Sequence, residues 1–273
     1  MLAISPIRNY STPSFGIFLH TIKDKDGNAV NRCDTAIFRN DLDFDKVVNF
    51  IDNKYEGVEK PKILNYACSD GEETYSLLAI MNSMLGKKAQ KFYPITAKDI
   101  NSDALKLANE GVYFFTFDEY MASDHFLGDD FNKYFSIRPR RYLRNPKNRA
   151  EQKKYDGANY AVSEELKPRV KFEYGNILDD AKNIDFKNTV LFARNFWPYL
   201  SKEEIVKLVK ILAKRMDNSS TLIIGSYDKE YGIDKLLIKN GFVETKVENV
   251  FELPKNFKYK NYIYDYEKHS IYE

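Results

Sequence analysis

The stretch KILNYACSDGEETYSLLAIMNSML, Lys62 to Leu85, decides the fold of this chain. Its first residues predict a strand through the apolar positions 63, 64, 66 and 67, and a sharp turn follows over 70–73. Apolar side chains then recur at spacings of three and four, which predicts a helix that buries Tyr75, Leu78, Ala79, Met81 and Leu85. Open α/β sheets place ligands where such a strand passes through a turn into a helix, so this turn is a candidate ligand site.

Two acids, Glu72 and Glu73, stand at the expected start of this helix. A helix N-terminus normally favours anions, but two carboxylates next to it would repel a pyrophosphate. We therefore expect a ligand that carries positive charge and hydroxyl groups. A purely structural alternative is a capping box, in which Glu72 reaches back to the amide of Ser69 while Gly71 eases the turn.

A second strand is predicted over 93–99, followed by a short helix over 102–109 that Gly111 closes. Asp99 ends this strand and is placed to accept hydrogen bonds from both hydroxyls of a ribose. Together with Glu72 and Glu73, it favours a nucleoside cofactor without phosphates. S-adenosylmethionine is the common cofactor of this kind, and its ammonium and sulfonium groups suit the two glutamates.

Further strands are predicted over 170–174, 189–193, 220–224 and 243–247, and helices over 202–215 and 235–240. The segment 189–193 is continuously apolar, as in a strand buried on both faces of a parallel sheet. Ser201 and Glu204 form a capping-box pattern at the start of the longer helix. The alternation of strands and helices predicts one doubly wound α/β sheet.

Composition agrees with this fold class. The chain has 273 residues and 43% hydrophobic content, enough for one α/β domain with an insertion. No apolar run reaches the length of a membrane span, the amino terminus lacks a signal-peptide pattern, and we expect the cytoplasm as compartment. The two cysteines and three histidines have no metal-binding spacing, so no metal site is expected.

Several segments resemble the CheR-type chemotaxis receptor methyltransferases, which use S-adenosylmethionine to esterify receptor glutamates. The segments occur in the family's order and register: DTAIFRN (34–40), ACSDGEETYS (67–76), AKDINSDALKLANEGVY (97–113), VKFEYGNIL (170–178) and FARNFWPYL (192–200). The similarity spans about residues 35–225. It implies a mostly parallel, Rossmann-like methyltransferase sheet with a small inserted subdomain, and S-adenosylmethionine as the cofactor.

The resemblance assigns candidate catalytic roles to Arg39 and Tyr199. It assigns cofactor binding to a larger set, which comprises Thr35, Arg39, Glu72, Glu73, Asp99, Asn176, Ile177, Arg194 and Asn195. The chain departs from the family pattern at Cys33, where an asparagine is usual, and at Asn101, where an acid is usual. Trp197 is predicted either to form an aromatic wall near the reacting methyl group or to pack in the core.

The resemblance divides the chain into a short segment over 1–60, in place of the family's helical domain, and a methyltransferase domain over 61–273 with an insertion over 112–168. Residues 138–154 hold eight basic residues and one acid. This charge predicts either a solvated loop or a docking surface for an acidic protein segment, with nucleic acid as a further alternative. Because the helical domain is replaced, the methyl acceptor need not be a chemoreceptor.

The expected reaction is methyl transfer to a carboxylate, as in a protein-glutamate methyl ester. A carboxylate is ionised at neutral pH and needs no general base, which agrees with motifs that contain no histidine. Arg39 is expected to orient the acceptor, and the alternatives are a contact with the carboxylate of the cofactor or a structural salt bridge. Tyr199 is expected to donate a hydrogen bond. The alternatives are a small-molecule or nucleic-acid methyltransferase, and a binding module without turnover.

Overall fold

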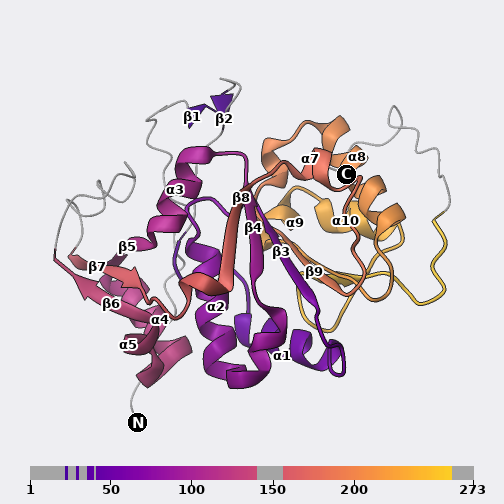
Figure 1. Ribbon diagram of the computed structural model, residues 1–273. Coiled ribbons are helices and arrows are strands. Elements are labelled where there is room, and N and C mark those ends of the chain that lie inside the picture. Colours follow the sequence, from indigo (N-terminus) through magenta and orange to yellow (C-terminus); the bar gives the residue numbers. More distant parts are fainter. Residues whose placement is uncertain (1–21, 24–28, 31–35, 40, 140–155, 260–273) are drawn as a thin grey trace, which may run out of the picture.

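The computed structural model describes residues 22–23, 29–30, 36–39, 41–139 and 156–259. In this part of the chain, seven strands form the main sheet in the order β11-β12-β10-β9-β3-β4-β8 (Figure 1). The strands are β3 (Lys62–Tyr66), β4 (Ile95–Asp99), β8 (Val170–Tyr174), β9 (Thr189–Ala193), β10 (Thr221–Ile223), β11 (Val243–Glu244) and β12 (Val250–Glu252). The run from β10 to β8 is parallel, and β12 and β11 complete the sheet in antiparallel pairing.

Strand β3 lies in the middle of the parallel run, with β4 on one side and β9 on the other. The chain therefore leaves β3 toward one edge of the sheet and later returns to its other side. In open α/β sheets, ligands bind beyond the carboxyl ends of the strands at such a switch point. The residues that follow β3, β4 and β9 include the sequence-predicted segments 67–73, 99–101 and 194–195.

Helices cover both faces of the main sheet. Side chains of β9 alternate between them: Val190 and Phe192 join one apolar cluster and Leu191 and Ala193 join the other. The first cluster includes residues of α1 (Phe44–Lys54) and α2 (Glu72–Leu85), and the second includes residues of α7 (Ile177–Asp180), α8 (Lys202–Arg215) and α10 (Ile233–Lys239). The predicted doubly wound, mostly parallel sheet is thereby confirmed.

Local signals predicted several element ends correctly. Ser201 and Glu204 form the expected capping box at the start of α8. Gly111 ends α3 (Ser102–Glu110) in the left-handed conformation with φ 59°, which glycine adopts without steric cost. The strands over 170–174 and 189–193 have the predicted bounds.

Other predictions were wrong in detail. Gly71 is the N-cap of α2, and no side chain caps this helix, so the alternative of a capping box between Ser69 and Glu72 is wrong. The strand predicted over 243–247 is only the short β11, and the chain returns as β12, which sequence patterns did not indicate. The helix predicted over 235–240 is α10, which begins at Ile233. A short helix, α9 (Ser226–Glu230), was also missed.

A three-stranded antiparallel sheet lies in the segment that was predicted as an insertion (Figure 1). Its order is β5-β7-β6, with β5 (Val112–Thr116), β6 (Phe135–Arg138) and β7 (Gly157–Val162). Helices α4 (Phe117–Leu127) and α5 (Phe131–Tyr134) join β5 to β6. Of the basic segment 138–154, positions 138 and 139 are described and the remainder lies outside the described residues.

The remaining elements are short. Strands β1 (Ile22–Lys23) and β2 (Ala29–Val30) form an antiparallel pair. Turns of 3-10 helix occur at Gly86–Phe92, Gly128–Asp130, Lys167–Arg169 and Trp197–Tyr199. None of the helices in the described ranges combines the length and the apolar character that crossing a bilayer requires.

Candidate functional site

The turn between β3 and α2 has an unusual backbone. Ala67 has φ 57°, Ser69 φ 54° and Gly71 φ 88°, so three residues within five occupy the left-handed region. Residues with side chains rarely adopt this conformation, and it persists where the surroundings hold the chain in place. A β-carbon on Gly71 would lie 2.9 Å from both Ala108 Cβ and Phe172 Cζ, so the turn is packed tightly against α3 and β8.

Asp99 connects this turn to the end of β4. Its Oδ2 accepts a hydrogen bond from the backbone N–H of Ser69 at 2.7 Å, and its Oδ1 accepts one from the N–H of Asn101 at 2.8 Å. Burial raises the pKa of Asp99, and the backbone hydrogen bonds act in the opposite direction. A carboxylate offers about four lone-pair positions, so these contacts leave acceptor capacity for ribose hydroxyls. The ribose role stays a prediction.

Asn176 and Ile177 lie beside Asp99, because β4 and β8 pair in parallel with Asp99 opposite Tyr174. Asn176 is the N-cap of α7, and its Oδ1 accepts a hydrogen bond from the N–H of Leu178 at 3.0 Å. Ile177 is buried. Both residues therefore lie at the edge of the sheet where the resemblance places cofactor contacts, and their contact with a ligand stays a prediction.

Asn101 occupies the position where the related family has a second acid. Its side-chain oxygen accepts hydrogen bonds from the backbone N–H groups of Asp103 at 3.0 Å and Ala104 at 3.1 Å, which caps α3. Asparagine is among the best N-cap residues, so the departure from the pattern preserves the start of this helix.

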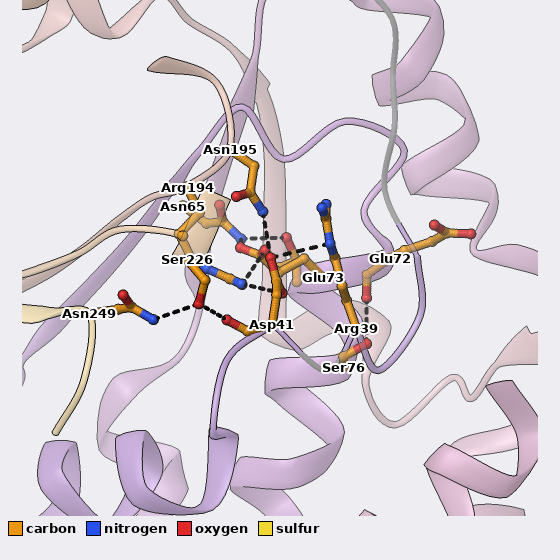
Figure 2. Close-up of polar contacts among 12 residues, drawn as sticks. Arg39, Asp41, Asn65, Glu72, Glu73, Ser76, Arg194, Asn195, Ser226 and Asn249 are labelled. Carbon is orange, nitrogen blue, oxygen red and sulfur yellow. Dashed lines mark hydrogen bonds and ion pairs between the residues drawn. The ribbon is translucent and has the colours of Figure 1, made fainter. Parts of the chain in front are cut away.

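A second group of side chains surrounds Arg194, which follows β9. Arg194 Nη1 lies 2.5 Å from Glu73 Oε2, and Nη2 lies 2.6 Å from Asp41 Oδ1 (Figure 2). The Arg194 side chain is only 1% exposed, so its charge depends on these two partners. Burial raises the pKa of Glu73 against the opposing effect of Arg194. Burial also acts to raise the pKa of Asp41, but Arg194 and Arg39 hold it below its usual value.

The segment that contains Arg39 is fastened to the first turn of α2. The backbone N–H of Phe38 donates to Ser76 Oγ at 2.8 Å, and Ser76 Oγ donates to the carbonyl of Glu72 at 2.8 Å. Phe38 itself has φ 48° and is buried, so this backbone is held firmly. Arg39 Nε lies 3.2 Å from Asp41 Oδ2.

The predicted site residues therefore come together from distant parts of the chain. Figure 2 shows Arg39, Glu73, Arg194 and Asn195 around Asp41, with Glu72 to one side of this cluster. Thr35 and Cys33 lie outside the described residues.

The two glutamates at the start of α2 differ in their surroundings. Glu73 forms the ion pair with Arg194, and its Oε1 lies 3.4 Å from Asn65 Nδ2. The carboxylate of Glu72 points away from this cluster (Figure 2). The charge of Glu73 is already balanced within the protein, so the electrostatic argument for a cationic ligand does not apply to Glu73.

The two aromatic candidates after β9 also differ. Trp197 is fully buried, stacks on Phe196 with ring centroids 5.1 Å apart, and donates from Nε1 to the carbonyl of Ala193 at 2.7 Å. The packing alternative is thereby confirmed for Trp197, and its proposed place in an aromatic wall is wrong. Tyr199 is 48% exposed and lies at the surface, where a ligand can reach it.

Sequence reasoning missed the acids that hold this site together. Asp41 contacts both arginines, and its only sequence signal is an acid two positions after Arg39. Asp228 is fully buried, and its Oδ2 accepts from the backbone N–H groups of Asn195 at 2.8 Å and Gly225 at 2.7 Å. Burial raises the pKa of Asp228 to about 7, against the opposing effect of these hydrogen bonds.

The arrangement fits the chemistry of S-adenosylmethionine. Among the residues that the structure describes, the buried atoms Ser69 Oγ and Asn195 Oδ1 have no hydrogen-bond partner. Buried polar atoms are nearly always paired in native proteins, so these two atoms mark unused hydrogen-bonding capacity beside Asp99 and Arg194. These atoms agree with a nucleoside cofactor, and the roles of Asp99 and Glu72 in binding it stay predictions.

Comparison with known proteins agrees with S-adenosylmethionine as the cofactor. The family model for the SAM-binding domain of CheR methyltransferases matches residues 33–122 and 140–237, well over half of the chain. A chemotaxis protein methyltransferase from Borreliella burgdorferi (strain ATCC 35210 / DSM 4680 / CIP 102532 / B31) is 26% identical over 202 residues. The match covers 70% of this chain and 62% of that relative.

Solved structures match this chain at low similarity. The methyltransferase domain of bacterial CtHen1 is 14% identical with a TM-score of 0.36, over 76% of this chain and 97% of that one. PKMT2 from Rickettsia typhi in complex with AdoHcy is 13% identical with a TM-score of 0.31, over 61% of this chain and 21% of that one.

Proposed function

This chain belongs to the CheR methyltransferase family, and from that premise we propose that it transfers a methyl group from S-adenosylmethionine to a carboxylate. The proposed acceptor is the side chain of a protein glutamate, and the product a methyl ester. The observation that carries the proposal is the meeting of Arg39 and Arg194 around Asp41 at the carboxyl edge of the sheet (Figure 2). A relative described as a chemotaxis protein methyltransferase supports the same class of reaction.

Each end of the cofactor has candidate partners. Asp99 would accept hydrogen bonds from the ribose hydroxyls, with Asn176 and Ile177 beside it on the neighbouring strand end. Glu72 would face the ammonium group. Arg194 and Asn195 would form the far wall, with Arg194 held by its ion pairs to Glu73 and Asp41. Thr35, which lies outside the described residues, is proposed as a further contact.

When bound, S-adenosylmethionine supplies an electrophilic methyl group on a sulfonium centre. The acceptor carboxylate is ionised at neutral pH, so the chain need not remove a proton from it. Catalysis then consists of positioning the nucleophile about 3–3.5 Å from the methyl carbon and excluding water. Arg39 would orient the acceptor through paired hydrogen bonds, and Tyr199 would donate another.

The origin of the acceptor is a separate proposal. The positive charge of residues 138–154 suits an acidic protein segment, which would dock there and present its glutamate to the site. A nucleic acid is the competing partner for the same charge. The two partners are distinguished by measuring the binding of duplex DNA and of acidic peptides at several salt concentrations. DNA binding that weakens strongly as salt rises, together with no binding of acidic peptides, would favour the nucleic acid.

The stability of the product in alkali tests the proposed acceptor. S-adenosylmethionine labelled in the methyl group is incubated with the protein and a lysate of the source cells, and the labelled material is then treated with mild alkali. A methyl ester hydrolyses and releases volatile labelled methanol, whereas N-methyl and most O-methyl ether groups survive. Label that resists alkali would contradict a carboxylate acceptor and would require a general base for an amine or a hydroxyl.

A further inference from the structure

Asp41 occupies the centre of the charged cluster, although it lies just beyond the segment 34–40 that carries the resemblance. Its Oδ1 lies 2.6 Å from Arg194 Nη2, and its Oδ2 lies 3.2 Å from Arg39 Nε and 3.0 Å from Asn195 Nδ2 (Figure 2). One carboxylate thus contacts three residues to which the proposed site assigns cofactor or acceptor contacts.

The backbone of Asp41 is anchored as well. Its carbonyl accepts a hydrogen bond from Ser226 Oγ at 2.9 Å, and Ser226 Oγ in turn accepts one from Asn249 Nδ2 at 3.0 Å. The loop that carries Asp41 is therefore tied to the start of α9 and to the turn before β12. Because Asp41 is held through both its backbone carbonyl and its side chain, its carboxylate can fix the position of the groups that it contacts.

The two arginines that Asp41 contacts differ in burial. Arg194 is buried and is also held by Glu73, whereas the Arg39 side chain is 33% exposed and extends from a loop. An arginine side chain loses about 2 kcal/mol of rotamer freedom when it is fixed. Asp41 engages the Nε edge of Arg39, and the terminal nitrogens of the guanidinium extend beyond that contact (Figure 2).

We propose that Asp41 is a positioning residue that acts through Arg39: its carboxylate, clamped by Arg194 and Asn195, fixes the guanidinium of Arg39 toward the bound cofactor and acceptor. This inference rests on the proposed methyltransferase function. The charged cluster then has a role beyond stability, because its contacts with residues next to the sheet restrict the movement of the Arg39 side chain.

The test is a double-mutant cycle between Asp41 and Arg39. Asp41→Asn is close in shape, and its amide oxygen can still accept from Arg194 in place of Oδ1. Its amide nitrogen would then replace Oδ2 opposite two donors, Arg39 Nε and Asn195 Nδ2, so the contact with Arg39 is lost. Asp43→Asn is the matched control, because Asp43 lies two residues away, caps α1 through an oxygen that asparagine also has, and touches none of the cluster.

Two quantities are measured for the wild type, Arg39→Ala, Asp41→Asn and the double variant: the dissociation constant of S-adenosylmethionine, and the rate of label transfer to lysate protein. We expect Arg39→Ala to change at least one of them by about 10–100-fold, the effect of losing a hydrogen bond to a charged group. Asp41→Asn should change the same quantity in the same direction, and the double variant should be no worse than Arg39→Ala. Asp43→Asn should match the wild type.

Arg39→Lys provides a second route if Asp41→Asn lowers the melting temperature severely. Lysine keeps the positive charge and lacks the Nε edge, so it should reproduce the Asp41→Asn defect. The proposal is overturned if Asp41→Asn behaves as the wild type, if the two defects add in the double variant, or if Arg39→Ala changes neither quantity. A wild type that neither binds S-adenosylmethionine nor transfers label would instead refute the proposed function itself.

Discussion

The two halves of the candidate site are built by different physical means. Around Asp99, the geometry is maintained by backbone hydrogen bonds from Ser69 and Asn101 and by a glycine that permits a tight turn. Around Arg194, it is maintained by ion pairs between side chains that are far apart in the sequence. The first half is therefore visible in local sequence patterns, and the second depends on the completed fold.

The largest loss of stability is expected when the ion pairs around Arg194 are removed. Arg194→Ala would leave the carboxylates of Asp41 and Glu73 in the interior without their main cationic partner. Removing one member of a buried ion pair typically costs about 3–5 kcal/mol, which we expect as the loss in free energy of unfolding. Urea denaturation measures it, with the exposed Lys207→Ala on α8 as control. A loss below about 1 kcal/mol, the size seen for surface pairs, would show that the cluster is not a structural centre.

The backbone half is tested at Asp99. Asp99→Ala should weaken binding of S-adenosylmethionine by about 1.5–3 kcal/mol, the usual contribution of hydrogen bonds to a charged group. Isothermal calorimetry measures the affinity, and Asp103→Ala, which removes an exposed acid in the first turn of α3, is the control. Wild-type affinity in a folded Asp99→Ala protein would place the ribose elsewhere.

Asp228 combines features of both halves of the site. It is a buried acid that accepts backbone hydrogen bonds, and one of its donors, Asn195, belongs to the ion-pair cluster. Its pKa is raised from 3.8 to about 7 in the folded state, so the folded chain keeps a proton that the unfolded chain releases in this range. The contribution of Asp228 to stability should therefore fall as pH rises from about 4 to about 7, and should change no further above that window.

Asp228→Asn removes this titration and keeps an oxygen for the two backbone donors. From about pH 4 to pH 7.5 the wild type should lose about 1–2 kcal/mol of unfolding free energy relative to the variant. This value is a fraction of the free energy that corresponds to the full pKa shift. Urea titrations at both pH values measure the difference. If the stability difference between the two proteins is the same at both pH values, Asp228 is ionised throughout and the raised pKa is refuted.

The smallest expected effect is a difference in stability between variants at the N-termini of two helices, α8 and α2. Ser201→Ala removes the capping box of α8 and should cost about 1 kcal/mol of unfolding free energy. Ser69→Ala, before α2, removes a hydroxyl that has no partner among the described residues, and stability should change by less than about 0.5 kcal/mol. Thermal melts of both variants give the comparison, and equal losses would mean that Ser69 supports α2 after all.

The same contrast explains what could be predicted from the sequence. The strands at 170–174 and 189–193 and the capped helix α8 depend on local apolar patterns and local hydrogen bonds, and their bounds were predicted closely. The return strand β12 has three residues and exists only because it pairs with β10, so a local pattern could not indicate it.

The site shows the same division. Asp99 and the turn before α2 follow a strand directly, and their position could be inferred from order along the chain. Asp41 and Asp228 each depend on a partner more than 30 residues away, Arg194 for Asp41 and Asn195 for Asp228, at distances fixed only by folding. For Glu73, sequence reasoning saw a charge available to a ligand, whereas the structure pairs that charge with Arg194. Only the resemblance to a family could place Arg39 beside them.

Direct titration of the wild-type protein with S-adenosylmethionine and with its demethylated product tests the central claim. If the carboxyl edge of the sheet is a nucleoside-cofactor site, both compounds should bind saturably, with dissociation constants in the range of about 1 μM to 1 mM that is common for enzyme ligands. Both should also raise the melting temperature. An absence of binding heat and of any thermal shift at millimolar concentration of either compound would contradict the account.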